Sequence, residues 1–141
     1  MSSKSFHLTI ITPERVVYDQ DIQKITLPTT EGEITVLADH ANLLSTLALG
    51  QISTVSDDAL SNFAVSGGFV EINNNKVTIL ANTAEHGAEI DEKRAQQAKD
   101  RAELLLKSAI HSDQDQALVS ASLQRALLRL KVLDRYRRHH K

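Results

Sequence analysis

The 141-residue sequence contains no cysteine, which excludes disulfide bonds and thiolate ligands for a metal ion. No apolar run approaches the roughly 18 residues that a membrane-spanning helix needs, and the apolar part of the N-terminus is too short for a secretory signal. Aromatic residues make up only 4% of the chain, so few rings are available for stacking on nucleic-acid bases. We therefore expect no direct membrane insertion, and attachment to a membrane only through a partner.

Motifs for catalysis are also missing. There is no Gly-x-x-x-x-Gly-Lys loop for nucleotide phosphates, because Gly67 and Gly68 lie in a predicted hairpin and no lysine follows them. Ser66, His40 and Asp39 supply the residue types of a hydrolytic triad, but residue types alone are weak evidence. His40 also lacks a second histidine at a ligand spacing such as i, i+4. We predict no catalytic residue and no metal site.

Charge is divided unevenly along the chain, although the formal net charge is only -2. Residues 1–88 contain four lysines and arginines against ten acids, whereas residues 89–141 contain twelve against eight. From Ser122 onward, seven bases face a single acid. The C-terminal part is therefore expected to meet an acidic partner: nucleic acid, anionic lipid, a nucleotide phosphate or an acidic protein.

Alternating apolar residues in the first part of the chain predict short β-strands separated by turns. The predicted strands cover about these ranges: 6–11, 15–18, 22–27, 34–37, 43–49, 52–55, 63–65, 69–72 and 76–80. The clearest hairpin turns at Asn73, Asn74 and Asn75, residues that tolerate positive φ, and the Gly67-Gly68 pair permits a bulge or a close backbone approach. About ten strands at this spacing indicate an all-β sandwich, assigned to residues 1–88.

The apolar period changes to three or four residues after Gly87, which predicts helices over residues 89–141. Asp91 is the expected N-cap of the first helix, and Ser112 with Asp115 resembles a capping box at the second. The first apolar stripe is mostly alanine and the second mostly leucine. Their members are Ala95, Ala98, Ala102, Leu105 and Ala109 in the first, and Val119, Leu123, Leu127, Leu130 and Leu133 in the second. We expect an antiparallel helical hairpin.

Several motifs occur in an order that resembles the epsilon subunit of the F-type ATP synthase over nearly the whole chain. They are ITPERVVY, then ITLPTTEGEITVL with His40 and Ala41 following, then VSGGFVEINNNKVTILANTAE, IDEKRAQQAKDRAE and ALVSASLQRALLRLKVL. The sequence departs from the family pattern at Thr35, Ala38 and Asn42, where the family more often has Gly, Pro and Pro. These departures concern details of docking more than the fold.

The resemblance implies a non-catalytic rotor subunit of the central stalk, which couples proton translocation to ATP synthesis. The sandwich would contact the gamma subunit and the ring of c subunits, through a loop region matched here by Glu31, Glu33 and His40. A solvated turn acid and a loop histidine are the alternative for Glu33 and His40. The implied location is peripheral, on the cytoplasmic face of the bacterial plasma membrane.

The helix pair resembles the regulatory element of this family. Folded on the sandwich it would leave the enzyme active, and extended into the catalytic head of alpha and beta subunits it would inhibit ATP hydrolysis. The basic residues that would meet the head are Arg125, Arg129, Lys131, Arg135, Arg137 and Arg138. Cations near a helix C-terminus also complement the helix dipole, which explains some of them without a partner.

Some members of the family bind ATP through a motif that matches Ile90, Asp91, Arg94 and Ala95. The matching arginines also include Arg101, Arg125 and Arg129. The resemblance thus implies ATP as a regulatory ligand, with no cofactor required. The alternative is that these arginines are solvated or pair with nearby acids.

A nucleic-acid-binding module that uses residues 125–141 is the competing interpretation, because basic helices bind phosphates. The acidic sandwich and the scarcity of aromatic residues argue against it. We therefore predict no nucleic-acid partner.

Overall fold

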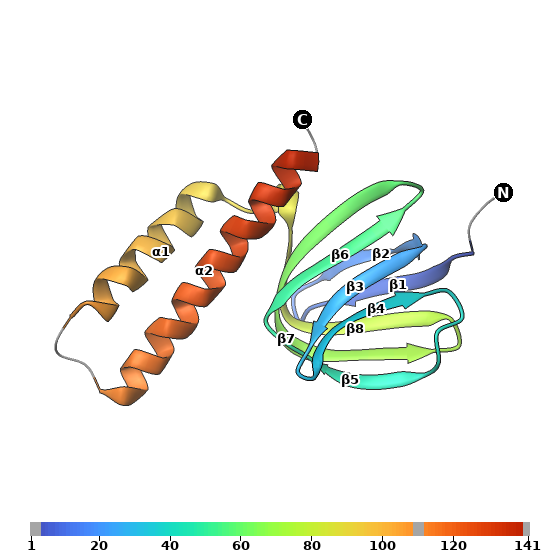
Figure 1. Ribbon diagram of the computed structural model, residues 1–141, viewed down its shortest axis with the longest axis horizontal. Coiled ribbons are helices and arrows are strands. Elements are labelled where there is room, and N and C mark those ends of the chain that lie inside the picture. The colour runs from blue at the N-terminus through green and yellow to red at the C-terminus, as the bar shows by residue number, and fades with distance from the viewer. Residues whose placement is uncertain (1–3, 109–111, 140–141) are drawn as a thin grey trace.

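The structure, a computed structural model, describes residues 4–108 and 112–139. It contains a β-sandwich followed by two helices that lie side by side and antiparallel (Figure 1). The elements are β1 Phe6–Ile11, β2 Val16–Ile22, β3 Lys24–Thr29, β4 Gly32–Leu37, β5 Leu43–Leu47, β6 Gly50–Ser56, β7 Ala59–Asn73, β8 Lys76–His86, the 3-10 turn η1 Gly87–Glu89, α1 Glu92–Leu106 and α2 Asp113–His139. The predicted fold class is confirmed.

The described residues form eight strands, not about ten, because β7 is one strand of 15 residues where the sequence predicts two. Its first half pairs with β6 and its second half with β5, so β7 belongs to both layers of the sandwich. Gly68 lies in the second half at φ 123°, and a Cβ there would lie 2.0 Å from the carbonyl oxygen of Leu80. The predicted close backbone approach is confirmed, and it keeps β7 against β8 where the strand changes layer.

The strand order is β2-β1-β8-β7-β5-β3-β4, with β6 pairing β3 and β7. All pairs are antiparallel except β1 with β8, which is parallel. Alternate residues point into the sandwich, as the period of two requires. The core includes Leu8, Ile10, Phe63 and Ile79, which are fully buried. Phe63 contacts the Tyr18 ring edge to face, at a centroid distance of 5.3 Å.

The predicted helix N-caps are both present. The amide of Arg94 donates to the Asp91 carboxylate at 3.1 Å, and the amide of Asp115 donates to the Ser112 hydroxyl at 3.1 Å. Each cap satisfies a backbone N–H that has no partner within its own helix. No helix within residues 4–108 and 112–139 is long and apolar enough to cross a bilayer.

Helix α2 lies between α1 and the sandwich (Figure 1). Ala95 and Ala102 of α1 are buried, as the alanine stripe predicts, but Leu105 is 48% exposed. On α2, Leu127 is 45% exposed and Ala126 is buried in its place. The stripe prediction is wrong at these two leucines. Leu105 is exposed because α1 packs chiefly against α2 and buries only a narrow face, and Leu127 is exposed because the buried face of α2 must serve two neighbours, α1 and the sandwich. Ala109 lies outside the described residues.

The sandwich and the helix pair meet in a small second apolar cluster. Its buried members are Ala64 on β7, Ile90 before α1, and Val132 and Leu133 on α2, with Leu128 and Tyr136 packed against them. Phe63, His86 and Tyr136 form a chain of edge-to-face ring contacts across the same junction, with centroid distances of 5.0 and 6.1 Å. Helix α2 therefore docks through few large side chains.

Candidate functional site at the junction of sandwich and helices

An open groove of about 560 Å³ runs between the sandwich and the helix pair. The loop between β1 and β2, the end of β8, η1 and both helices contribute to its wall. The lining residues are Thr12, Glu14, Arg15, Asn82, Thr83, Ala84, Glu85, Glu89, Ala98, Ser122, Arg125, Ala126 and Arg129. This volume suits a small-molecule ligand, and the lining is rich in charge of both signs.

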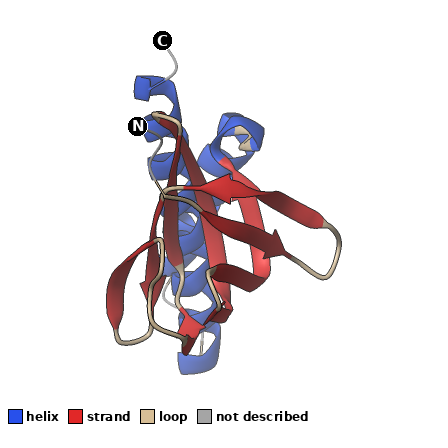
Figure 2. Cartoon of the chain, turned by 90° about the vertical axis from the view of Figure 1, so that its right-hand side faces the viewer, coloured by secondary structure: helices blue, strands red, loops and turns tan. Residues whose placement is uncertain are grey.

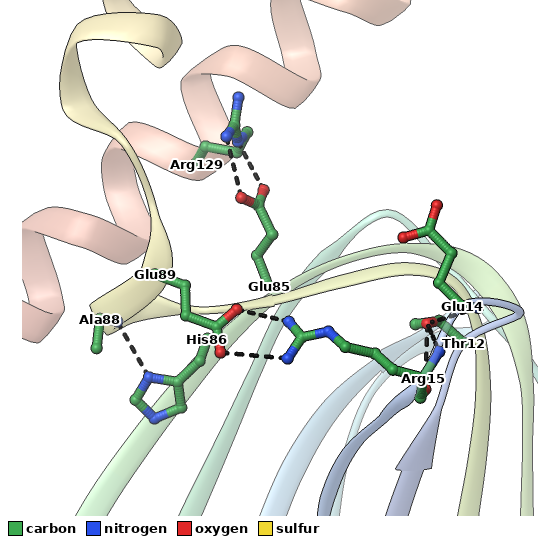
Figure 3. Close-up of polar contacts among 8 residues, drawn as sticks. All are labelled: Thr12, Glu14, Arg15, Glu85, His86, Ala88, Glu89 and Arg129. Carbon is green, nitrogen blue, oxygen red and sulfur yellow. Dashed lines mark hydrogen bonds and ion pairs between the residues drawn. The ribbon is translucent and has the colours of Figure 1, made fainter.

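Two arginine–glutamate pairs cross the groove region (Figure 3). Arg129 of α2 donates two hydrogen bonds to Glu85 of β8, at 2.7 and 3.0 Å, and this pair is partly buried. Arg15 donates to Glu89 of η1 at 2.5 and 3.5 Å, and this contact raises the pKa of Arg15. Bidentate pairing of this kind fixes orientation as well as charge. The two pairs tie α2 and η1 to the sandwich.

The 3-10 turn η1, which connects β8 to α1, is capped by a histidine. His86 ends β8, and its Nδ1 accepts the amide N–H of Ala88 at 3.0 Å (Figure 3). A larger residue at Gly87 would clash with α2, since a Cβ there would lie 2.9 Å from Cβ of Tyr136. Chain entry into α1 is thus set by close packing of η1 against α2.

The predicted ATP-binding arginines separate into two groups. Arg125 and Arg129 line the groove, Arg125 holding the Ser122 hydroxyl at 3.1 Å. Arg94 and Arg101 are not among the lining residues. They flank the groove residue Ala98 at spacings of four and three, so they lie on the same face of α1.

The other residues of the predicted motif have structural contacts. Asp91 caps α1 and lies 3.9 Å from the Arg94 guanidinium. Ile90 is buried in the cluster with Val132 and Leu133, and Ala95 is fully buried on α1. These contacts explain the residue types without a ligand, and they do not exclude one.

Some of the remaining basic residues of α2 form ion pairs and others do not. Arg137 donates to Glu92 at the start of α1 at 2.7 Å, which lowers the pKa of Glu92. Arg138 pairs with Asp134 on its own helix at 3.0 Å. Lys131 and Arg135 have no ion-pair partner within the described residues. They line a second groove of about 580 Å³, which Glu33 also lines.

Glu31, Glu33 and His40 are distributed along one edge of the sandwich. Glu31 lies in the turn before β4, Glu33 lies on β4, and His40 lies in the loop after it. β4 is the last strand in the sheet order, and Glu33, Thr35 and Leu37 are exposed on it. The predicted residues therefore lie on a strip formed by an edge strand and its two ends.

A row of exposed apolar side chains crosses the sheet. Phe69 of β7 is paired with Leu80 of β8, and Leu80 is paired in turn with Ile11 of β1. Ile11 is opposite Val16 of β2. Phe69 and Val16 are each 57% exposed and Leu80 is 51% exposed. A contiguous exposed row of this kind is typical of a protein-binding surface.

Sequence reasoning missed Arg15, Glu85 and Glu89 as site residues. Their partners are 74 and 44 residues away in the chain, so no local pattern could have identified them. Within the described ranges, no cluster of three or more His, Asp or Glu could hold a metal ion.

Two family models match the chain. The ATP synthase delta/epsilon chain beta-sandwich domain matches residues 5–87, and the ATP synthase delta/epsilon chain long alpha-helix domain matches residues 88–134. The ATP synthase epsilon chain of Nitratidesulfovibrio vulgaris (strain DP4) is 43% identical over 129 residues, covering 92% of this chain and 96% of the relative. That of Caldanaerobacter subterraneus is 41% identical over 134 residues, covering 94% and 96%.

Solved structures agree on the fold. A chain of the Euglena gracilis mitochondrial ATP synthase aligns with a TM-score of 0.67 at 22% identity, covering 95% of this chain and 81% of that one. A chain of the Tetrahymena thermophila mitochondrial ATP synthase central stalk and c-ring aligns at 0.64 and 14%, covering 94% and 99%. With both family models matched in order and the relatives covered almost completely, the chain is a non-catalytic subunit of ATP synthase and belongs to the family of ATP synthase epsilon chains.

Proposed function

We propose that the chain works as a rotor subunit of the central stalk, with the sandwich as its docking body and the helix pair as a detachable regulatory arm. The observation that carries this proposal is the separation of the two apolar clusters. The sandwich core is continuous and closed, whereas the helix pair adds only the small cluster around Ile90, Val132 and Leu133. An arm that contributes little to the main core can leave it without unfolding it.

The gamma subunit would dock on the exposed row of Val16, Phe69 and Leu80. The residues of this row lie on strands that are already hydrogen-bonded into the sheet, so binding needs no backbone rearrangement. The c-ring would meet the strip formed by Glu31, Glu33 and His40. Figure 2 shows the helix pair behind the sheet, and within the strip Glu33 also lines the groove that Lys131 and Arg135 of α2 border.

Membrane attachment would then be peripheral, through the ring, on the cytoplasmic face of a bacterial plasma membrane. Ring rotation, driven by proton translocation, would reach the catalytic head through the gamma subunit and this sandwich.

In the inhibitory state the released helix pair would present its basic residues to an acidic segment of the alpha and beta head. The folded state supports this division of labour, because Arg129 and Arg137 are held by Glu85 and Glu92. Release from the sandwich would free Arg129 for another acidic partner, whereas the pair of Arg137 with Glu92 lies within the helix pair and would remain.

ATP would favour the folded state by binding in the groove beside Arg125 and Arg129, with Arg94 and Arg101 on the adjoining face of α1. The groove volume and the guanidinium groups of Arg125 and Arg129 in its wall support this proposal. Because Glu85 already holds Arg129, ATP would have to share or displace that contact. Isothermal titration of the intact chain tests it: measurable heat at micromolar to millimolar ATP is expected, and no heat would refute it.

The inhibitory role is tested by a chain truncated after Glu89, assembled into the whole ATP synthase. ATP hydrolysis by the complex should rise severalfold while assembly is unchanged. The matched control is Lys93→Gln, which keeps the arm and removes an exposed charge of α1 that is not among the residues expected to meet the head, and it should leave hydrolysis unchanged. Hydrolysis that is identical with and without the arm would contradict an inhibitory helix pair.

A further inference from the structure

The loop of residues 38–42 between β4 and β5 lies beside the turn between β7 and β8, at the end of the sandwich away from the helix pair (Figure 1). Both segments use left-handed backbone. Asn74 and Asn75 have φ of 51° and 64°, and Asp39 has φ of 65°. Asn and Asp tolerate this region better than other side chains, because their short polar groups bond nearby backbone.

Two hydrogen bonds join the turn to the loop, one on each side of His40. The amide of Asp39 donates to the Asn75 side-chain oxygen at 2.8 Å. The amide of Asn74 donates to the Asn42 side-chain oxygen at 3.1 Å. We call these four residues, Asp39, Asn42, Asn74 and Asn75, the amide clamp. Since Asn42 and Asn75 each supply an oxygen from one segment to an N–H of the other, the bonds are reciprocal.

The clamp is itself anchored to the start of the chain. The Asn75 side-chain N–H₂ donates to the carbonyl oxygen of Ser5 at 3.0 Å, and the backbone carbonyl oxygen of Asn75 accepts the amide N–H of His7 at 3.2 Å. Lys4 also lies 3.2 Å from the Asp39 carboxylate, but this pair is well exposed and adds little. Asn75 thus connects three segments that are distant in sequence.

His40 has a defined hydrogen-bonding state within this loop. Its Nδ1 lies 2.7 Å from the carbonyl oxygen of Ala41. A carbonyl oxygen only accepts, so Nδ1 carries a proton, and in the tautomer with this single ring proton Nε2 is an acceptor. Within residues 4–108 and 112–139 this Nε2 has no hydrogen-bond partner. It is an available acceptor at a fixed place on the loop.

We propose that Asn42 and Asn75 are positioning residues, which hold the loop on both sides of His40 so that its Nε2 is presented in one orientation to a hydrogen-bond donor of a protein partner. The clamp reduces the number of loop conformations before binding, and a partner then loses less entropy in docking. This functional half rests on the proposed docking role of the strip that includes His40. The clamp itself is a property of the isolated chain.

The structural half is tested by amide hydrogen exchange on the intact chain. Asn42→Ala removes the acceptor, whereas Asn42→Asp keeps a side-chain oxygen in the same place. We expect the exchange of the Asn74 amide to accelerate about tenfold in Asn42→Ala and to return to within about twofold in Asn42→Asp. Asn73→Ala, beside the turn but outside the clamp, is the control.

Asn75→Gly supplies a second variant that keeps the left-handed turn and removes only the side chain. Exchange at Asp39 should then accelerate, and the ¹⁵N shifts of His40 should move toward a mixture of tautomers, a change that simple destabilisation of the sandwich would not produce. Unchanged exchange at Asn74 and Asp39 in both variants, with unchanged His40 shifts, would overturn the clamp.

The functional half is tested by binding to ATP synthase from which the epsilon chain has been stripped. Asn42→Ala should bind about fivefold more weakly, with Asn42→Asp and Asn73→Ala within about twofold of the unmodified chain. Equal affinity of Asn42→Ala and the unmodified chain would overturn the positioning role. Failure of the unmodified chain to bind would instead refute the docking role, and the exchange data would still decide the clamp.

Discussion

The core of the sandwich and its junction with the helix pair are built differently. The core contains large side chains such as Phe63, Leu8 and Ile10 that are excluded from solvent completely. The junction buries Ile90, Val132 and Leu133, and adds the ring contacts of His86 and two exposed or partly buried ion pairs. At about 1.5–3 kcal/mol per buried apolar side chain, the junction contributes on the order of 5 kcal/mol before ordering costs. The chain thus combines a closely packed sandwich with a weaker contact between the sandwich and the helix pair.

The largest expected effect is in the core. Phe63→Ala removes a fully buried ring that contacts Tyr18 and His86, and should lower the free energy of unfolding of the sandwich by about 3–5 kcal/mol. Urea denaturation followed by fluorescence or by circular dichroism measures this change in the free energy of unfolding. A loss below about 1 kcal/mol would mean that the core is far less closely packed than described.

Leu133→Ala should separate the two regions. It removes a buried side chain from the junction only, so docking of α2 should weaken by about 2–3 kcal/mol while the urea midpoint of the sandwich stays nearly constant. Energy transfer between dyes on the sandwich and on α2 reports the docking. If the sandwich midpoint falls as far as it does for Phe63→Ala, the two regions are one cooperative unit.

The ion pair of Arg129 with Glu85 should contribute less, about 1 kcal/mol, because both side chains retain partial contact with water. A double-mutant cycle with Arg129→Gln and Glu85→Gln, read by the same dye pair, isolates it. Arg125→Gln is the control, since among the described residues Arg125 bonds only to the Ser122 hydroxyl. A coupling energy of zero would show that this pair does not stabilise the docking of α2 on the sandwich.

The smallest expected effect is a pH dependence in the sandwich. The His7 ring donates hydrogen bonds to the carboxylates of Asp21 and Asp19, which raise its pKa, while Lys76 lies opposite it on β8. A raised folded-state pKa gives stability that is full below the unfolded value near 6.5 and is lost as pH rises through the folded pKa. The stability difference between the unmodified chain and His7→Gln should therefore be larger at pH 5.5 than at pH 8.5, by less than about 1 kcal/mol for this exposed site. The opposite ordering in urea titrations would contradict the assignment.

Sequence patterns predicted those features that depend on residues close together in the chain. Alternation located the strands, and the caps at Asp91 and Ser112 were readable because a capping oxygen and its amide are three residues apart. The count of strands was wrong because Gly67 and Gly68 look like an interruption, whereas the structure uses them inside one long strand.

Contacts between distant segments could not be predicted in this way. Nothing in the sequence near Glu85 indicates that Arg129 will reach it, and nothing near Asn42 indicates a bond to Asn74. The buried face of α2 was misassigned at Leu127 for the same reason, since the face depends on which two neighbours the helix contacts. The candidate ATP residues came from a family motif, and the structure places only Arg125 and Arg129 in the groove wall.

Native-state hydrogen exchange on the intact chain tests most directly the central claim that the arm can leave the body. Once detached, a short helix pair is marginally stable and exchanges its amides. We predict that amides of α1 and α2 exchange through an opening that costs at least about 2 kcal/mol less than the opening of β1, β7 and β8, with a smaller urea dependence. Equal opening free energies and equal urea dependence in the two regions would contradict it.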